Sequence, residues 1–140
     1  IYNLTQADCF SEDTGLEVFA LDGKPGVKSA RFAGDACDDK QNINKLLHDL
    51  KTVNNRSAQF KTVISLIIDG EEKQFTGICK GRIAENEKGE NGFGYDSIFI
   101  PDGSEYHFAE MLMEEKNNFS HRKKATKQLI NYLSEKYGQN

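Results

Sequence analysis

The most restrictive feature of the sequence is an apolar run followed by a tight-turn signal and a second alternating segment. The run Val63-Ile64-Ser65-Leu66-Ile67-Ile68 lies in a predicted strand over residues 60–69, and its composition is typical of a strand covered on both faces. Asp69-Gly70 favours a hairpin turn. Residues 73–84 then form the returning strand, with two glycines that would allow a bulge or a bend. The sequence therefore predicts a long antiparallel hairpin.

Strands and turns are expected before this hairpin. A short strand over residues 8–12 is predicted to break at Asp13-Thr14-Gly15, and residues 16–21 alternate well enough to form another. Residues 22–28 contain Asp-Gly and Pro-Gly and predict an ordered loop, followed by one helical turn over residues 29–34.

Two longer helices are also predicted. The first is headed by Asp38-Asp39 and should end near Thr52. Ser120 should cap the last helix, and residues 98–100 form a short strand before it. The apolar stripes expected to be buried are Ile43, Leu46, Leu47 and Leu50 in the first helix, and Ala125, Leu129, Ile130 and Leu133 in the last. Helices and strands mix without an internal repeat, which predicts one mixed α/β domain.

Composition limits the class of protein. The chain has 140 residues, 37% of them hydrophobic and 29% charged, which suits one globular domain. No apolar run approaches the roughly 18 residues of a membrane span, and the first residues lack a signal-peptide pattern. A cytoplasmic protein is therefore expected. The net charge of -4 argues against a general nucleic-acid binder, but residues 116–127 hold five Lys or Arg and no acid, which suits a small anionic ligand.

Glu12-Asp13 is the first candidate site. Two adjacent acids beside a glycine could bind a hard divalent cation, which prefers carboxylate oxygen. The alternative is a turn or capping role for one acid and a solvated position for the other.

Phe93-Gly94-Tyr95-Asp96 is the second. Glycines on both sides of Phe93 allow close approach to a ligand, the ring offers a stacking surface for a base, and Asp96 could accept hydrogen bonds from a purine edge. The alternative is a core aromatic residue beside a glycine bend.

Lys116 and His121-Arg122 form the third candidate, for phosphate and base-edge contacts. A helix capped by Ser120 would present free N–H groups beside His121 and Arg122, which favours an anion site. The alternative is a solvated basic face, which we prefer for Lys123, Lys124 and Lys127. The histidines His48 and His107 are expected at the surface.

Five blocks carry a resemblance to a known family. In order and spacing, the chain resembles the inosine triphosphate pyrophosphatase (Ham1-like, XTP/dITP diphosphatase) family from about Asp8 to Leu133. The blocks are Glu12-Asp13-Thr14-Gly15-Leu16-Glu17-Val18, Pro25-Gly26-Val27-Lys28-Ser29-Ala30-Arg31-Phe32-Ala33-Gly34, Gly92-Phe93-Gly94-Tyr95-Asp96, Phe108-Ala109-Glu110-Met111, and Lys116-Asn117 with Ser120-His121-Arg122.

The resemblance implies a mixed α/β fold with a long bent central sheet flanked by helices in two lobes, in a homodimer. It also implies Mg²⁺-dependent hydrolysis of ITP, dITP and XTP to the monophosphate and pyrophosphate. Carried over by position, Asp13 resembles the metal-binding proton acceptor, with Glu12 as a second carboxylate. The residues that resemble the family's substrate contacts are Thr14, Phe93, Gly94, Tyr95, Asp96, Lys116, His121 and Arg122.

The chain departs from the family pattern at three places. Ser97 stands where proline is usual and should loosen the preceding turn, and His107 stands where threonine is common. Family members also begin with a strand, a Thr/Ser-Asn-Asn…Lys phosphate loop and a metal-binding glutamate, none of which lies upstream of Ile1. Residues 1–140 are therefore expected to be one pyrophosphatase domain lacking its N-terminal segment. The alternatives are a catalytically impaired nucleotide-binding or dimerisation module, or a Maf-like pyrophosphatase acting on other modified nucleotides.

Overall fold

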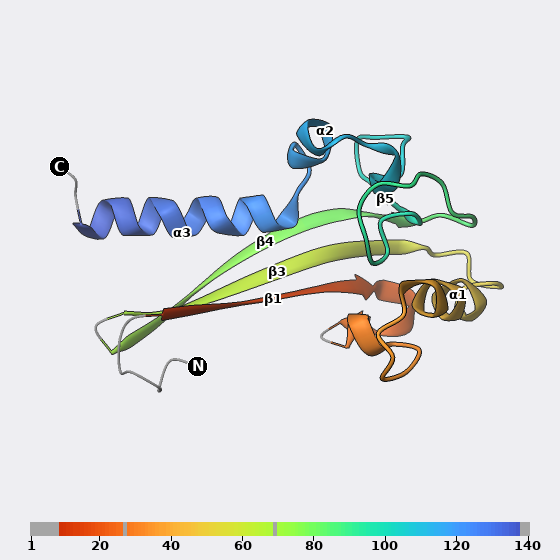
Figure 1. Ribbon diagram of the computed structural model, residues 1–140, viewed down its shortest axis with the longest axis horizontal. Coiled ribbons are helices and arrows are strands. Elements are labelled where there is room, and N and C mark those ends of the chain that lie inside the picture. Colours follow the sequence, from red (N-terminus) through yellow and green to blue (C-terminus); the bar gives the residue numbers. More distant parts are fainter. Residues whose placement is uncertain (1–8, 27, 69, 138–140) are drawn as a thin grey trace.

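The computed structural model describes residues 9–26, 28–68 and 70–137 and contains a five-stranded antiparallel sheet with helices packed on it (Figure 1). The strand order is β2 (Lys24–Gly26), β1 (Cys9–Val18), β3 (Ser57–Ile68), β4 (Glu71–Ile83) and β5 (Phe99–Pro101). The helices are α1 (Asp39–Asp49), α2 (Met113–Asn117) and α3 (His121–Tyr137), with 3-10 turns η2 (Phe19–Leu21), η3 (Ser29–Arg31) and η4 (Phe108–Glu110). The predicted mixed α/β class is confirmed.

The predicted hairpin is formed by β3 and β4. Residues pair one for one from Ser57↔Arg82 to Ile68↔Glu71, so the strand contains no bulge. Along β3, buried residues alternate with half-buried ones, which contradicts the expectation of a strand covered on both faces. Only one face packs against α3, where Ile64 contacts a cluster containing Leu129. Asp69, in the predicted turn, lies outside the described residues.

The predicted break at Asp13-Thr14-Gly15 is wrong. β1 runs through this segment without interruption and pairs with β3 from Cys9↔Ile67 to Val18↔Ala58. Gly15 permits a close approach instead of a turn, because a Cβ at this position would overlap the carbonyl oxygen of Gly26 in β2. The loop expected over residues 22–28 accordingly contains the short edge strand β2.

Gly77 has a similar role on β4. A Cβ there would overlap the carbonyl oxygen of His121 and lie 2.6 Å from the amide nitrogen of Ala125. The glycine therefore lets the first turn of α3 sit directly on the sheet, and this contact places the start of α3 beside β3 and β4.

Both long helices begin close to the predicted positions. The side chain of Asp38 caps α1 by accepting hydrogen bonds from the amides of Lys40 at 2.9 Å and Gln41 at 3.2 Å. Ser120 caps α3, since its Oγ accepts from the amide of Lys123 at 3.1 Å. Of the predicted stripes, one residue is misplaced, because Ile130 is 56% exposed. The other predicted residues of α3, Ala125, Leu129 and Leu133, are buried or partly buried, and Tyr132 packs with them.

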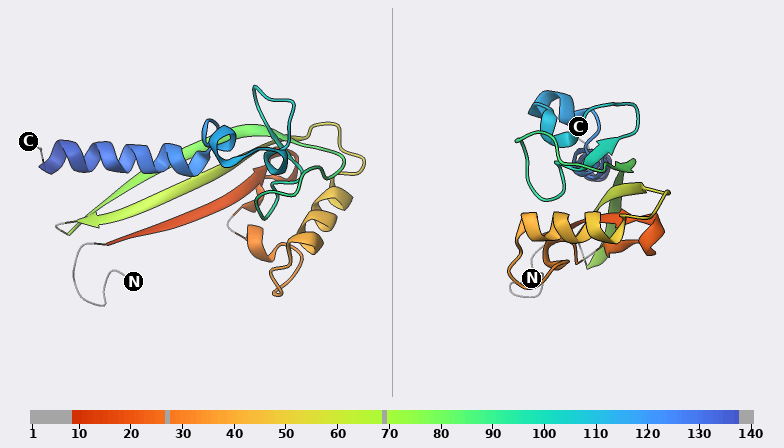
Figure 2. Two further views of the ribbon diagram at one scale, coloured as in Figure 1. Left: turned by 45° about the horizontal axis from the view of Figure 1, so that its top comes forward. Right: turned by 90° about the vertical axis from the view of Figure 1, so that its right-hand side faces the viewer.

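The long strands carry two groups of elements at one end (Figures 1 and 2). The α1 lobe comprises residues 19–26 and 28–50, and the α2 lobe comprises residues 84–119. In the end-on view of Figure 2 they lie on opposite sides of the strand ends. The larger hydrophobic cluster joins both, with Leu46 from α1 and Phe108 from η4. Within the described part of the chain, no helix has the length and apolar character that crossing a membrane requires.

Candidate functional site

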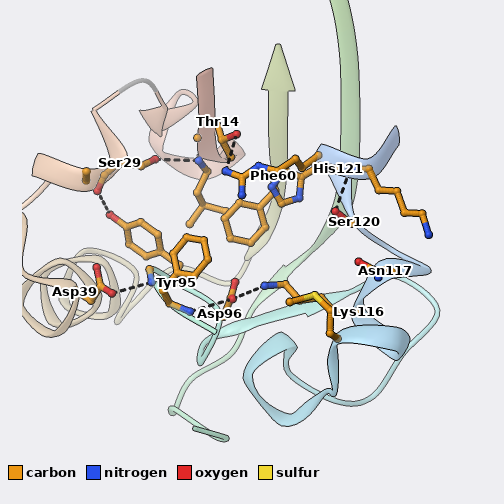
Figure 3. Close-up of a pocket in the computed structure, with 18 of the residues that line it drawn as sticks. Thr14, Ser29, Asp39, Phe60, Tyr95, Asp96, Lys116, Asn117, Ser120 and His121 are labelled. Carbon is orange, nitrogen blue, oxygen red and sulfur yellow. Dashed lines mark hydrogen bonds and ion pairs between the residues drawn. The ribbon is translucent and has the colours of Figure 1, made fainter. Parts of the chain in front are cut away.

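A cavity of about 540 Å³ lies between the two lobes and is lined by residues of β1 and β3 as well (Figure 3). Its walls come from β1, η3, α1, β3, α2, the start of α3 and the loop before β5. The predicted substrate contacts that line it are Thr14, Phe93, Gly94, Tyr95, Asp96, Lys116, His121 and Arg122. The fold thus brings together residues from three separate sequence blocks. Glu12 and Asp13 do not line this cavity.

The aromatic turn, defined here as residues 92–97, is organised around the carboxylate of Asp96. This side chain is 6% exposed, and its Oδ2 accepts hydrogen bonds from the amide of Phe93 at 3.2 Å and from Nζ of Lys116 at 2.7 Å. A Cβ at Gly92 would overlap this carboxylate, which explains the glycine before Phe93. The Phe93 ring itself is 67% exposed, so it is available as a stacking surface.

Lys116 is held at the wall of the cavity by three groups. Besides the ion pair with Asp96, its Nζ lies 5.5 Å from the ring centre of Phe93 and 5.3 Å from that of Phe108. The sequence placed Asp96 at the base and Lys116 at the phosphates. In the structure they form one ion pair, in which Asp96 is buried and Lys116 is partly buried.

The α1 lobe contacts the aromatic turn directly. Oδ2 of Asp39 accepts a hydrogen bond from the amide of Gly94 at 2.8 Å, and the hydroxyl of Tyr95 donates to the carbonyl oxygen of Ser29 at 2.6 Å. Burial, with a smaller contribution from the nearby Asp39 carboxylate, raises the pKa of Tyr95 well above its usual range. Tyr95 therefore stays protonated and keeps its hydrogen bond across the cavity.

His121 lies on the floor of the cavity, stacked against Phe60 with ring centres 4.9 Å apart and planes 15° from parallel. It is 9% exposed, and within the described residues its buried Nδ1 has no hydrogen-bond partner. Burial, followed by the positive charges of Arg122, Lys116 and Lys124, lowers its pKa to about 4. At neutral pH the imidazole is therefore uncharged, with one donor and one acceptor nitrogen.

Arg122 reaches across to β1. Its Nε pairs with Oε2 of Glu12 at 2.9 Å, and its Nη2 lies 3.5 Å from Oγ1 of Thr14. Thr14 also hydrogen-bonds Oγ1 of Thr62 on β3 at 2.8 Å. Glu12 and Thr14 thus face α3, on the same side of the sheet as the cavity.

Asp13 lies on the other side of the sheet, because successive residues of a strand point to opposite faces. It is exposed and lines a separate cavity of about 150 Å³ together with Glu17 and Lys61. The two acids expected to act together are therefore separated by the sheet. Across the described residues, no group of three or more His, Cys, Asp or Glu side chains is arranged to hold a metal ion. The metal-binding and catalytic roles of these acids stay predictions.

Other residues of the cavity were not predicted as site residues. Ser29, Asp39, Phe60, Met113, Asn117, Ser120 and Lys123 also line it. The local sequence predicts a first-turn acid at Asp39 and a solvated basic face at Lys123. Their position at the cavity depends on contacts between distant segments, such as the 55 residues that separate Asp39 from Gly94, and no local pattern signals it.

The surface position predicted for His107 is wrong, whereas His48 is exposed as predicted. His107 is 4% exposed, its Nδ1 lies 2.7 Å from the carbonyl oxygen of Ser97, and its amide donates to Oε1 of Glu110. Ser97, expected to loosen the turn, gives it a further hydrogen bond, because its hydroxyl donates to Oε1 of Glu87 at 2.9 Å. The two unusual residues therefore contact each other behind the aromatic turn.

The chain is similar over most of its length to known proteins of one kind. A dITP/XTP pyrophosphatase of Christiangramia forsetii is 55% identical over 127 residues, covering 91% of this chain and 67% of the relative. One from Flavobacterium psychrophilum is 55% identical over 126 residues, covering 90% and 66%. The solved structure of the Staphylococcus aureus Ham1 protein matches with a TM-score of 0.90 at 44% identity, covering 93% of this chain and 68% of that one.

This chain therefore spans about two thirds of the length of these relatives. The family model described as the Ham1 family matches residues 1–132. The sequence match, the shared fold and the site residues gathered around one cavity all lead to the same conclusion: the chain belongs to the Ham1 family.

Proposed function

We propose that this protein hydrolyses non-standard purine nucleoside triphosphates, such as dITP, ITP and XTP, to the monophosphate and pyrophosphate, and so cleanses the nucleotide pool. The names of its relatives support this activity. The observation that carries the proposal is the cavity, which the exposed Phe93 ring, the imidazole of His121 and the guanidinium-bearing Arg122 line together.

Base selection follows from the donors in the cavity. The Phe93 ring stacks on the base, while Arg122 and the neutral His121 offer N–H groups to the oxygen at position 6 of a purine. Adenine carries an amino group at that position, so a donor would face a donor and one of them would lose its hydrogen bond. Discrimination of this kind is large, because the unpaired group is buried.

Lys116 is proposed to contact the phosphates. Its ammonium has three N–H donors, so it can keep its hydrogen bond to Asp96 and still donate to a phosphate oxygen. Thr14, at the side of the cavity near Arg122, is proposed as a further substrate contact.

Asp13 is proposed as the proton acceptor for the attacking water and as the residue that would hold Mg²⁺. The exposed carboxylate has suitable ligand chemistry, since Mg²⁺ commonly binds through one or two carboxylates and completes its shell with phosphate oxygens and water. Its position fits less well, because it points to the face of the sheet opposite the cavity that Lys116 lines. Such an ion would neutralise charge on the phosphates. Glu12, proposed as a second ligand, lies on the cavity side of β1 but is already paired with Arg122, so the two carboxylates do not converge on one ion within this chain.

The activity can be tested with the full-length protein, ITP, XTP, ATP and GTP, with pyrophosphate release as the measurement. We expect ITP and XTP to be hydrolysed on the order of 100-fold faster than ATP, and EDTA to stop the reaction until Mg²⁺ is restored. Equal turnover of all four nucleotides would contradict the proposed selectivity. ITP binding without hydrolysis would instead indicate a silent nucleotide-binding module, and preference for other modified nucleotides a Maf-like enzyme.

We also propose that the protein is a cytoplasmic homodimer, as the family resemblance implies. Size-exclusion chromatography of the full-length protein with light-scattering detection should give twice the subunit mass. A monomer at micromolar concentration would contradict the dimer, and fractionation of cells would test the location.

A further inference from the structure

The first turn of α1 is linked to the aromatic turn directly at Gly94 and, through Glu87, at Ser97. Asp39 accepts the hydrogen bond from the amide of Gly94 at 2.8 Å, as the dashed line in Figure 3 shows. The next residue, Lys40, forms an ion pair with Glu87, which in turn accepts the hydrogen bond from the hydroxyl of Ser97. One end of a helix therefore holds both sides of a turn that belongs to the other lobe.

The position of the Phe93 ring depends on this backbone. The glycines that flank it, Gly92 and Gly94, have φ angles of 82° and 61°, in the left-handed region that favours glycine. The ring is 67% exposed, so side-chain packing contributes little to its orientation. What directs the ring over the cavity is the conformation of the turn, and the amide of Gly94 is where the α1 lobe holds that turn.

The carboxylate of Asp39 is suited to this contact. A hydrogen bond to a charged acceptor is roughly twice as strong as one between neutral groups. The contact also acts alongside the hydrogen bond from Tyr95 to Ser29, whose Oγ accepts from the amide of Leu16 in β1 at 2.9 Å. The two lobes are thus joined beside the cavity at two neighbouring residues of the aromatic turn.

We propose that Asp39 is a positioning residue for nucleobase binding: through the Gly94 amide it holds the aromatic turn against the α1 lobe, so that Phe93 stays in place to stack on the base. This inference rests on the proposed function, in which Phe93 binds the base. Asp39 acts through the turn and makes no contact with the reacting phosphate in this scheme.

The adjacent residue offers a matched control. Asp38 caps the same helix through the amides of Lys40 and Gln41, and it is neither the acceptor for the Gly94 amide nor the partner of Glu87. Asp38→Ala should lower the melting temperature through the lost helix cap and leave the KM for ITP unchanged. Asp39→Ala should raise that KM on the order of tenfold and leave kcat within about twofold. Asp39→Asn keeps an oxygen acceptor and should stay within about threefold of the wild-type KM.

Three results would overturn the proposal, all obtained with the full-length protein. The first is an unchanged KM for ITP in Asp39→Ala, and the second is an equal rise in KM in Asp38→Ala. The third is a rise in KM in Asp39→Asn as large as that in Asp39→Ala. The last would mean that the charge itself contacts the substrate.

A second measurement is independent of activity. The amide hydrogen of Gly94 should exchange on the order of tenfold faster in Asp39→Ala than in the wild type or in Asp38→Ala. Unchanged exchange would overturn the contact even in an active enzyme. If the wild type hydrolyses none of the nucleotides while exchange changes as expected, the proposed function fails and the contact between Asp39 and the turn stands.

Discussion

The aromatic turn and the acid pair on β1 are held by the fold in different ways. In the turn, Asp96 is 6% exposed and accepts from both the Phe93 amide and Lys116, and the α1 lobe holds the Gly94 amide. On β1, Glu12 and Asp13 are both exposed and point to opposite faces of the sheet. The difference teaches that the recognition part of the site is preorganised within this chain, whereas Asp13 is positioned by its strand and Glu12 by its strand and an ion pair with Arg122.

This difference separates the expected effects of mutation. Substitutions of buried groups around the turn should change stability as well as binding, because those groups have partners within the protein. Substitutions of the acids should change activity and leave stability nearly unchanged. The four predictions below test this contrast, from the largest expected effect to the smallest.

Asp13→Asn should lower turnover of ITP by about 100-fold or more, the loss typical of a general base, and shift the melting temperature by less than about 1 °C. Steady-state kinetics and calorimetry measure the two effects. Glu17→Gln is the matched control, since Glu17 lies on the same strand and lines the same small cavity. Wild-type turnover in Asp13→Asn, or an equal loss in Glu17→Gln, would remove Asp13 from the mechanism.

Lys116→Met should lower the free energy of unfolding by about 3 kcal/mol, because it leaves the Asp96 carboxylate buried without its charged partner. Urea unfolding followed by circular dichroism measures this. Lys40→Met removes an exposed ion pair, with Glu87, and should cost about 0.5 kcal/mol or less. Similar small losses in both variants would show that the turn is not stabilised by its buried ion pair.

His121 should make stability depend on pH. Its pKa is about 4 in the folded protein and 6.5 when unperturbed, so the unfolded state binds more protons between these values and stability rises with pH. The free energy of unfolding should therefore fall by at most about 3 kcal/mol as the pH drops from 6.5 to 4. Denaturation at several pH values measures the slope.

His121→Gln should remove this part of the slope, whereas His48→Gln, at an exposed position on α1, should keep it. The same slope in His121→Gln as in the wild type would contradict a buried, neutral imidazole at the floor of the cavity.

Phe93→Ala should weaken ITP binding about tenfold, the loss expected for one base–aromatic stack, and leave the free energy of unfolding within about 0.5 kcal/mol. Its side chain is 67% exposed, whereas Tyr95 and Asp96 of the same turn are buried. Titration calorimetry measures the affinity. Tyr106→Ala removes another exposed ring of the same lobe, 60% exposed and away from the cavity, and unchanged ITP affinity is expected there. Equal affinity losses in the two variants would argue against stacking.

Local patterns predicted much of the fold. The hairpin of β3 and β4 and the capped starts of α1 and α3 follow from composition, turn residues and apolar spacing, which depend on neighbours along the chain. The errors lie where distant segments meet. Asp13-Thr14-Gly15 has the local pattern of a turn, but pairing with β3 keeps it extended and Gly15 accommodates the backbone of Gly26.

In the candidate site, too, local patterns were predictable and contacts between distant segments were not. The sequence alone identified the residue types, since an aromatic ring between glycines, a lysine and a His-Arg pair after a capping serine are each recognisable within a few positions.

Only the tertiary structure decided their relations. It paired Asp96 with Lys116, buried His121 against Phe60, placed Asp13 across the sheet from Glu12 and brought Asp39 to the aromatic turn. The physical reason is that such contacts and the burial of a charge depend on which distant segments pack together, whereas the chemistry of a side chain and the conformation of its own turn depend on the residue and its neighbours.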